Sequence, residues 1–353
     1  MAREIDQTQW MNAYLTEINR TAELLPDRVL NTVYFGGGTP SLMQPDIVAA
    51  ILQRISQCWP QANDLEVTLE ANPGSVEAGR FAGYSQAGVS RISMGFQALN
   101  DTDLRRLGRI HTVAEARKAY DIARRYFDRV SFDLIYARQD QTLNDWQAEL
   151  REAVDMAADH LSLYQLTVEN GTAFGDRYAK GGLRGLPGDD LSADMYLVTQ
   201  EICDAAGLPA YEVSNHARPG AESRHNLIYW RYGDYIGIGP GAHGRITKDR
   251  RRATVAWSSP ERWLRAVDQG SGDKSSEALA AHDQANEYLM MGLRIRGGID
   301  RARFEALAGR ALPEEVLTHL HEIGMIQPPG PRIEATDQGR MVLNSVIKEL
   351  LLD

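Results

Sequence analysis

The stretch NTVYFGGGTPSL (residues 31–42) decides the fold, because an apolar run at 33–35 leads directly into three glycines. Such a run is typical of a buried strand. A helical pattern with its own apolar face resumes from Pro45. Glycine lacks a Cβ atom, so its backbone accepts a ligand at close range. The stretch therefore predicts one unit of a parallel α/β sheet, with a small-molecule site where the strand ends.

The same alternation of strand and helix patterns continues along the chain. After a helix over 8–25, strand-like runs at 65–72, 89–97, 129–137 and 160–169 alternate with helical periods near 76–86, 101–127 and 142–157. This order predicts a parallel sheet covered by helices. A Gly- and Asp-rich loop or lid over 170–190 follows, then a helix at 190–206, a strand at 209–217 and an irregular cap over 225–244. Helices and a hairpin at 325–336 predict a winged-helix-like C-terminal module.

Composition narrows the classes of function. A net charge of −10 over 353 residues opposes sequence-independent binding to nucleic acid. No apolar run is long enough for a membrane span, and the N-terminus lacks a signal peptide pattern, so we expect a cytoplasmic protein. Cys58 and Cys203 are the only cysteines. Two cysteines exclude a disulfide framework and any metal or iron–sulfur site made from cysteines of this chain alone.

Polar residues follow most of the predicted strands. They are Glu70, Gln97, Asp133 and Gln165, with Arg109 shortly beyond the third strand. Structural alternatives exist for the separate features. The glycines can form an ordinary turn, Glu70 can cap a helix, and Asp133 can be a buried carboxylate with Arg109 as its partner. Because the carboxyl ends of parallel strands meet at one edge, the set as a whole predicts a site for a ligand that carries an amino-acid group, a ribose and an adenine.

These segments resemble the oxygen-independent coproporphyrinogen III oxidase family of radical S-adenosylmethionine (SAM) proteins, and most of all its HemW-type heme chaperone branch. The resemblance rests on VYFGGGTPSL, LEVTLEANPGSV, GVSRISMGFQALNDTDLRRLGRIH, SFDLIYARQDQT and HLSLYQLTVENGTAF, with the stretch at 211–244. It implies a partial (β/α)6 radical SAM barrel that lacks its first strand and carries a C-terminal winged-helix-like α+β domain. The expected domains are the barrel (1–170), its lid and cap extension (171–270) and the C-terminal domain (271–353).

The resemblance also implies roles for single residues. Gly37, Gly38 and Thr39 would contact SAM, and Glu70 would hold its polar end. Gln97, Arg109 and Asp133 match positions that line the SAM site or its surroundings. We can assign no role to Arg138 and Asp140, which replace a Gly-Leu-Pro turn of many relatives.

One departure concerns the [4Fe–4S] cluster that the family uses to bind SAM. A Cys-x-x-x-Cys-x-x-Cys motif precedes the glycine strand in relatives, and this chain has no such motif. Two explanations compete: the natural chain starts further upstream, or the protein is a cluster-free descendant. We favour the first, because the polar residues of the site are retained although they are costly to bury without a ligand. We expect no cluster to form on this chain after reconstitution with iron and sulfide.

The motif HNLIYW (residues 225–230) offers His225 as an imidazole ligand for iron, with flat aromatic faces beside it. The resemblance links this motif to heme binding in the chaperone branch. A hydrogen-bonded core histidine is the alternative interpretation, and His216 and His243 are competing ligands.

Three functions remain open from the sequence. The first is a chaperone that binds heme and SAM and delivers heme to acceptor proteins; the resemblance also allows a membrane-associated acceptor and a homodimer. The second is an oxygen-independent coproporphyrinogen III oxidase of porphyrin biosynthesis, so whether the protein is an enzyme stays open. The third is a protein that binds SAM without chemistry. The HNLIYW motif favours the heme carrier.

Overall fold

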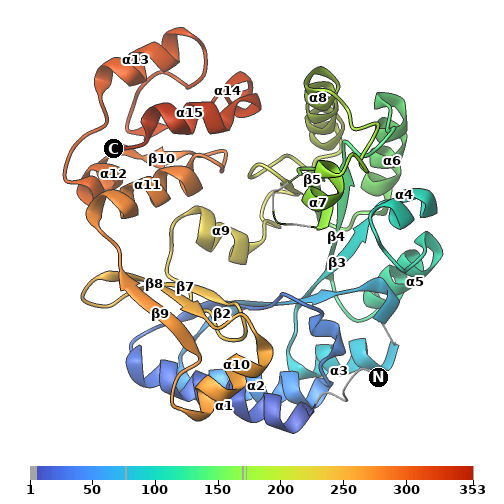
Figure 1. Ribbon diagram of the computed structural model, residues 1–353, viewed down its shortest axis with the longest axis vertical. Helices are drawn as coiled ribbons and strands as arrows, with labels where there is room; N and C mark the ends of the chain where they lie inside the picture. The colour runs from blue at the N-terminus through green and yellow to red at the C-terminus, as the bar shows by residue number, and fades with distance from the viewer. Residues whose placement is uncertain (1–5, 76–77, 169–170, 172, 353) are drawn as a thin grey trace.

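The computed structural model describes residues 6–75, 78–168, 171 and 173–352, and its centre is one curled sheet (Figure 1). The six strands follow one another in chain order, with β1 at one edge. The first five pair in parallel and the sixth is antiparallel to the fifth. They are β1 (Leu30–Phe35), β2 (Gln61–Ala71), β3 (Arg91–Gln97), β4 (Arg129–Tyr136), β5 (His160–Gln165) and β6 (Asn215–Ala217). The predicted partial barrel is confirmed.

Helices cover the convex face of this sheet (Figure 1). They are α1 (Gln7–Leu24), α2 (Pro45–Cys58), α3 (Ala78–Ala87), α4 (Asp101–Arg106), α5 (Val113–Ala123), α6 (Leu143–Met156) and α8 (Asp189–Ala205). Single 3₁₀ turns, η1 (Pro40–Leu42) and η2 (Pro73–Ser75), follow β1 and β2, and the short α7 (Ala173–Ala179) lies in the predicted lid. Among the described helices, none combines the length and apolarity that crossing a bilayer needs.

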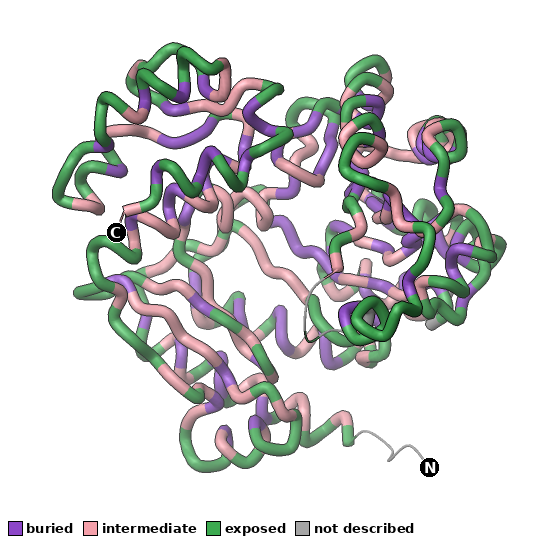
Figure 2. Tube along the Cα trace, turned by 45° about the horizontal axis from the view of Figure 1, so that its top comes forward, coloured by how far each residue is buried: buried purple, intermediate pink, exposed green. Residues whose placement is uncertain are grey.

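The two faces of the sheet differ in chemistry because successive side chains of a strand point to opposite sides. On β2, Val67 and Leu69 belong to the main apolar core together with residues of the outer helices. The alternate residues Glu66, Thr68 and Glu70 therefore face the concave side. Figure 2 places the buried positions mainly along the strands and the inward sides of the helices. The sheet thus has an apolar outer face and a polar inner face.

Helix α9 (Arg224–Trp230) lies within the concave side of the sheet, between the strands and the C-terminal module (Figure 1). The irregular cap expected over 225–244 therefore begins with a helix. Ser223 caps this helix by accepting a hydrogen bond from the Asn226 N–H at 3.3 Å. After α9 the chain forms an antiparallel sheet of β7 (His243–Thr247), β8 (Arg251–Ala256) and β9 (Asp273–Ala278), with α10 (Pro260–Asp268) between the last two strands.

The C-terminal module has an apolar core of its own, which includes Leu289, Phe304 and Leu317. Its elements are α11 (Ala281–Gly292), β10 (Ile299–Asp300), α12 (Arg301–Ala308), α13 (Glu314–Glu322), β11 (Arg332–Ile333), α14 (Asp337–Met341) and α15 (Leu343–Leu350). The predicted hairpin at 325–336 is reduced to one bridge, and β11 pairs instead with β10. This is a winged-helix-like arrangement, while the domain limits at 170 and 270 stay predictions.

Candidate functional site

The glycine turn after β1 forms one part of the carboxyl rim of the sheet. Gly37 and Gly38 have φ angles of 77° and 59°, in the left-handed region that favours glycine. A Cβ atom added to either would meet no described atom within 4 Å. The turn therefore exposes backbone on an open side, where a ligand can reach it. Thr39 continues the same turn and precedes η1.

Glu70, at the end of β2, holds this turn. Its carboxylate accepts a hydrogen bond from the Gly37 N–H at 3.1 Å and another from the Tyr34 hydroxyl at 2.7 Å. Burial and the negative charge of Glu70 raise the pKa of Tyr34, so Tyr34 stays a donor. The Glu70 side chain is half-buried. The carboxylate is thus oriented before any ligand arrives.

Gln97 and Asp133 form the next part of the rim, on β3 and β4. The Gln97 amide donates to Asp133 Oδ2 at 2.8 Å. Gln97 holds a φ of 76°, which is strained for a residue with a side chain and lies beside a register shift in β3. Asp133 Oδ1 is buried with no hydrogen-bond partner among the described residues. Burial raises the pKa of Asp133 to about 6, against the opposing charge of Arg109.

The rim gathers seven of the eight site residues that the sequence predicts. Gly37, Gly38 and Thr39 follow β1, and Glu70, Gln97 and Asp133 end or approach the ends of the next three strands. Arg109 is exposed in the loop after α4 and acts on Asp133 through its charge. Gln165 also lies at the rim, exposed at the end of β5.

His225, the eighth predicted residue, lies on α9 and contacts β1. Its Nδ1 is 2.9 Å from Thr32 Oγ1 and its Nε2 is 2.8 Å from the Tyr229 hydroxyl. Its ring stacks on Tyr34, with centroids 4.6 Å apart and planes 14° from parallel. Burial lowers the pKa of His225 to about 4, so the imidazole is neutral at neutral pH. Through Tyr34, His225 is one contact away from Glu70 and the glycine turn.

Buried charges at the other end of the sheet fix α9. The N–H of His225 donates to Glu66 Oε1 at 3.1 Å, and Arg129 Nη1 donates to Glu66 Oε2 at 2.9 Å. Arg129 also donates to the Ala221 carbonyl at 2.6 Å. Sequence reasoning missed Glu66, Arg129 and Tyr34. The signal was the period-2 alternation of polar and apolar residues within the strands, which predicts a polar inner face.

The two competing histidines lie apart from this network. His216 is buried in β6, and burial lowers its pKa to about 4. His243 is exposed at the start of β7. Among the described residues, neither histidine forms a hydrogen bond with the glycine turn or with Glu70.

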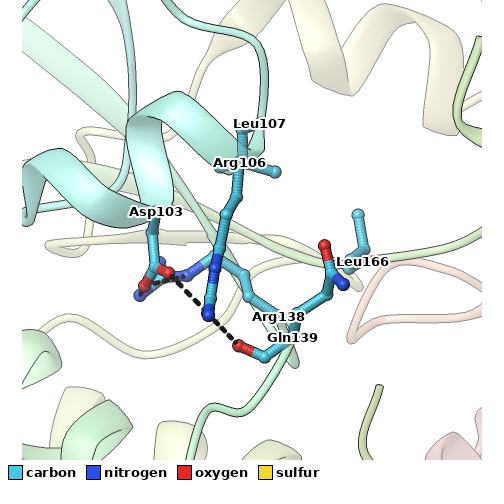
Figure 3. A pocket seen from close by; sticks show the side chains of 6 residues that line it. All are labelled: Asp103, Arg106, Leu107, Arg138, Gln139 and Leu166. Carbon is cyan, nitrogen blue, oxygen red and sulfur yellow. Dashed lines mark hydrogen bonds and ion pairs between the residues drawn. The ribbon is translucent and has the colours of Figure 1, made fainter. Parts of the chain in front are cut away.

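Arg138 and Asp140 have a structural role, and Figure 3 shows Arg138 together with Asp103 and Arg106. Arg138 is 3% exposed and forms ion pairs with Asp103 at 2.9 Å and with Glu149 at 2.5 Å. Asp140 pairs with Arg106 at 3.0 Å. The cavity beside them measures about 10 Å³, which is room for one water molecule. The loop that departs from relatives is therefore stabilised by buried ion pairs and offers no room for a ligand.

The rim residues fit SAM, whereas the cysteines do not fit a [4Fe–4S] cluster. The unpartnered Asp133 Oδ1, the open left-handed glycines and the oriented Glu70 suit a ligand with ammonium and hydroxyl donors. Cys58 lies on the outer helix α2, and Cys203 is buried in α8, where burial raises its pKa to about 12. Within the described ranges, no three His, Cys, Asp or Glu residues gather in a way that could hold a metal ion.

Comparisons with known proteins agree with this architecture. Residues 9–153 match the radical SAM superfamily and residues 279–342 match the HemN C-terminal domain. The chain is 36% identical to "Heme chaperone HemW" of Escherichia coli over 355 residues, covering 99% of this chain and 92% of that protein. It is 35% identical to "Radical S-adenosyl methionine domain-containing protein 1, mitochondrial" of Bos taurus, covering 99% of this chain and 82% of that protein.

A solved structure has the same fold over nearly the whole chain. It is the coproporphyrinogen III oxidase HemN from Escherichia coli, described as a radical SAM enzyme, with a TM-score of 0.81 and 19% identity. The alignment covers 99% of this chain and 84% of that structure. The matched segments at both ends and the full-length relatives lead to one assignment: the chain belongs to the HemW and HemN family of radical SAM proteins.

Proposed function

We propose that this protein is a heme chaperone that binds SAM at the carboxyl rim, binds heme through α9, and delivers heme to acceptor proteins. The main support for the proposal is a series of three contacts, which runs from Gly37 through Glu70 and Tyr34 to His225. It links the glycine turn to the helix that carries HNLIYW. The names of relatives such as the Escherichia coli heme chaperone support the same cargo.

In this proposal the rim holds SAM by its polar groups. Gly37, Gly38 and Thr39 lie against the methionine end, and the Glu70 carboxylate accepts hydrogen bonds from its ammonium group. The free Asp133 Oδ1 accepts from a hydroxyl or ammonium donor. Gln97 keeps Asp133 in place, and Arg109 favours its ionised form. At the rim the proposal covers the binding of SAM without a cluster, because the cysteines of this chain do not fit one.

Heme is the cargo, and His225 is its proposed iron ligand. A neutral imidazole is the form that ligates iron, and the low pKa of His225 supplies it. In the tautomer in which the Tyr229 hydroxyl donates to Nε2, the Nδ1–H donates a hydrogen bond to Thr32 Oγ1. Iron would take the place of the Tyr229 hydroxyl at Nε2. The bond to Thr32 would then orient the ring, as a second hydrogen bond does at many metal sites.

The test of heme carriage uses hemin titration followed by transfer. We expect His225→Ala to lose the Soret shift of the wild type, while His282→Ala, a change at an exposed histidine, keeps it. Heme-loaded wild type is then mixed with an apo-acceptor such as apomyoglobin, and transfer is followed by absorption. A His225→Ala spectrum identical to that of the wild type excludes the ligand role. A failure to transfer heme excludes the carrier function.

The SAM site is tested separately by calorimetry. We expect Glu70→Gln to weaken SAM binding about tenfold, since a charge-assisted hydrogen bond is lost. Glu23→Gln, on the exposed end of α1, is the matched control and should bind like the wild type. If Glu70→Gln and the wild type bind SAM with equal affinity, the proposal that SAM binds at this rim is wrong.

A further inference from the structure

His111 contacts the end of β3 from the loop that joins α4 to α5. It is buried, with 4% of the residue exposed. Its Nε2 is 3.3 Å from the carbonyl oxygen of Phe96, the residue before Gln97. On its other side, a Cβ atom built on Gly74 would lie 3.6 Å from the His111 Cβ. His111 therefore packs between the end of β3 and the turn η2, which follows the strand of Glu70.

The carbonyl of Phe96 lies in an irregular part of the sheet. The pairing of β3 with β4 is regular up to Met94 and shifts before Gln97, where three residue steps on β3 (94 to 97) match two on β4 (132 to 134). Such a mismatch is a β-bulge, and it interrupts the ladder of backbone hydrogen bonds. A buried carbonyl at this place needs a donor from elsewhere in the chain. The His111 ring supplies that donor.

The bulge directs the Gln97 side chain toward Asp133. Gln97 has a φ of 76°, a left-handed conformation that is disfavoured for a residue with a side chain. Its amide donates to Asp133 Oδ2 at 2.8 Å. A Cβ atom built on Gly95 would lie 3.3 Å from the Gln97 amide nitrogen and 4.0 Å from Asp133 Oδ1, so these two groups lie close together over Gly95. Bulges beside functional sites commonly redirect a side chain in this way.

The contact with Phe96 also assigns the tautomer of His111. Because a carbonyl oxygen only accepts hydrogen bonds, Nε2 carries the ring proton. Nδ1 then has a lone pair, and it is buried with no hydrogen-bond partner among the described residues. Burial lowers the pKa of His111, against a smaller opposing effect of the bond to Phe96, so the imidazole is neutral at neutral pH. The ring therefore acts as a donor to a single carbonyl.

We propose that His111 is a positioning residue of the rim. Its Nε2–H holds the Phe96 carbonyl and so keeps Gln97 in the left-handed conformation, in which the Gln97 amide orients Asp133. The same loop carries Arg109, two residues before His111, and the charge of Arg109 also acts on Asp133. The inference rests on the proposed function for the identity of the ligand, which is SAM. It adds a residue that acts on the rim through its neighbours and does not touch the ligand.

Two substitutions of His111 are compared by calorimetry with SAM at neutral pH. His111→Leu removes the donor, and we expect SAM affinity to fall about tenfold, because the Phe96 carbonyl loses its partner and Gln97 is released. His111→Gln places an amide N–H near the position of Nε2 and should bind SAM within about threefold of the wild type. Equal SAM affinities of His111→Leu and the wild type overturn the proposal.

Thr112→Ala is the matched control in the same loop. Thr112 caps α5 by accepting from the Glu115 N–H at 3.2 Å, and its loss leaves the bond between His111 and Phe96 in place. Loss of a helix cap destabilises the fold, so this variant should unfold at a lower urea concentration than the wild type. Its SAM affinity should equal that of the wild type. If Thr112→Ala and His111→Leu lose SAM affinity equally, His111 has only a general stabilising role and the proposal is wrong.

A double-mutant cycle tests the route through Gln97. In a Gln97→Ala background, His111→Leu should change SAM affinity by less than about twofold, because the side chain that His111 positions is already absent. Additive losses in the two single variants and the double variant overturn this route.

Measurements without ligand separate this inference from the proposed function. The hydrogen bond from Gln97 lowers the pKa of Asp133, so His111→Leu should raise the pKa of Asp133 above its wild-type value of about 6, whereas His111→Gln should not. NMR of the side-chain carboxyl carbons follows this titration. An unchanged Asp133 titration in His111→Leu rejects the positioning role, even where SAM binds at the rim. A raised pKa in a protein that does not bind SAM rejects the SAM site and keeps the positioning role.

NMR of the imidazole nitrogens gives a test on the wild type, with no substitution that could affect folding. We expect the proton of His111 on Nε2 at neutral pH, as the contact with the Phe96 carbonyl requires. A proton on Nδ1 overturns the proposal, because Nε2 could not then donate to that carbonyl.

Discussion

The ring of His225 lies flat on the ring of Tyr34, with centroids 4.6 Å apart, while the Tyr34 hydroxyl donates to Glu70 at 2.7 Å. One side chain of β1 therefore contacts both the helix proposed to carry heme and the carboxylate proposed to hold SAM. A change in one site that moves Tyr34 therefore also moves a contact of the other site.

Tyr34→Phe tests this link. The substitution keeps the ring that stacks on His225 and removes the hydroxyl that orients Glu70. We expect SAM affinity to fall about fivefold, in line with one hydrogen bond of about 1 kcal/mol, and hemin affinity to stay unchanged. Calorimetry and Soret titration measure the two. Tyr126→Phe, at an exposed tyrosine, is the control. A loss of hemin binding in Tyr34→Phe would contradict the assignment of separate roles to ring and hydroxyl.

SAM binding should depend on pH through Asp133. The pKa of Asp133 is raised to about 6, so its carboxyl is ionised above that pH and neutral below it. Because an ionised carboxylate favours a cationic ligand, SAM affinity should fall as the pH drops from 7.5 to 5, approaching about tenfold per unit at the lower end. Asp133→Asn should flatten this profile, and Asp121→Asn, on exposed α5 surface, should not. A profile for Asp133→Asn that matches the wild type would place the titrating group elsewhere.

Glu66→Gln should loosen α9. The Glu66 side chain is 2% exposed and balances Arg129 and the buried Arg91. Removing its charge leaves a buried guanidinium without its counterion, so the free energy of unfolding should fall by about 3 kcal/mol in urea titrations. Hemin affinity should fall too, because the N–H of His225 loses a charged acceptor.

Asp64→Asn is the matched control on the same strand. Asp64 also pairs with α9, through Arg224 at 2.6 Å, but its side chain is 77% exposed. Because water screens exposed ion pairs, the Asp64 pair contributes little to stability and this variant should resemble the wild type. Equal losses in the two variants would show that burial of Glu66 is unimportant.

Arg138→Met should separate stability from binding. The change leaves Glu149 without its buried partner, and we expect the free energy of unfolding to fall by about 3–5 kcal/mol. SAM and hemin affinities of the folded protein should stay unchanged, because Arg138 lies apart from both sites. Arg106→Met, at a side chain 42% exposed, should cost less than about 1 kcal/mol. A specific loss of ligand affinity in Arg138→Met would revise its structural role.

The sheet and its rim were predictable because their signals are local. Apolar runs, glycines and strand-end acids predict β1 to β5 and bring Glu70 and Asp133 to one edge of the sheet. Helix α9 was not predictable, because its amino end is stabilised by Glu66, which lies 159 residues away from His225. The pairing of β10 with β11 was missed for the same reason, since each strand has only two residues and depends on its distant partner.

Arg138 shows a second limit of prediction from the sequence. The sequence revealed that the loop differs from relatives, but the reason lies in Asp103 and Glu149, which come from α4 and α6. A charged residue without a local partner carries no local signal of its burial.

Helix α9 is held at its two ends: Glu66 accepts the His225 N–H near its start, and Arg303 donates to the Arg231 carbonyl at its finish. The two ends of α9 are therefore fixed by contacts that involve neither the His225 ring nor the Trp230 side chain. Substitutions on the His225 face and on the Trp230 face should then have additive effects on free energy, although the two residues are five apart in sequence.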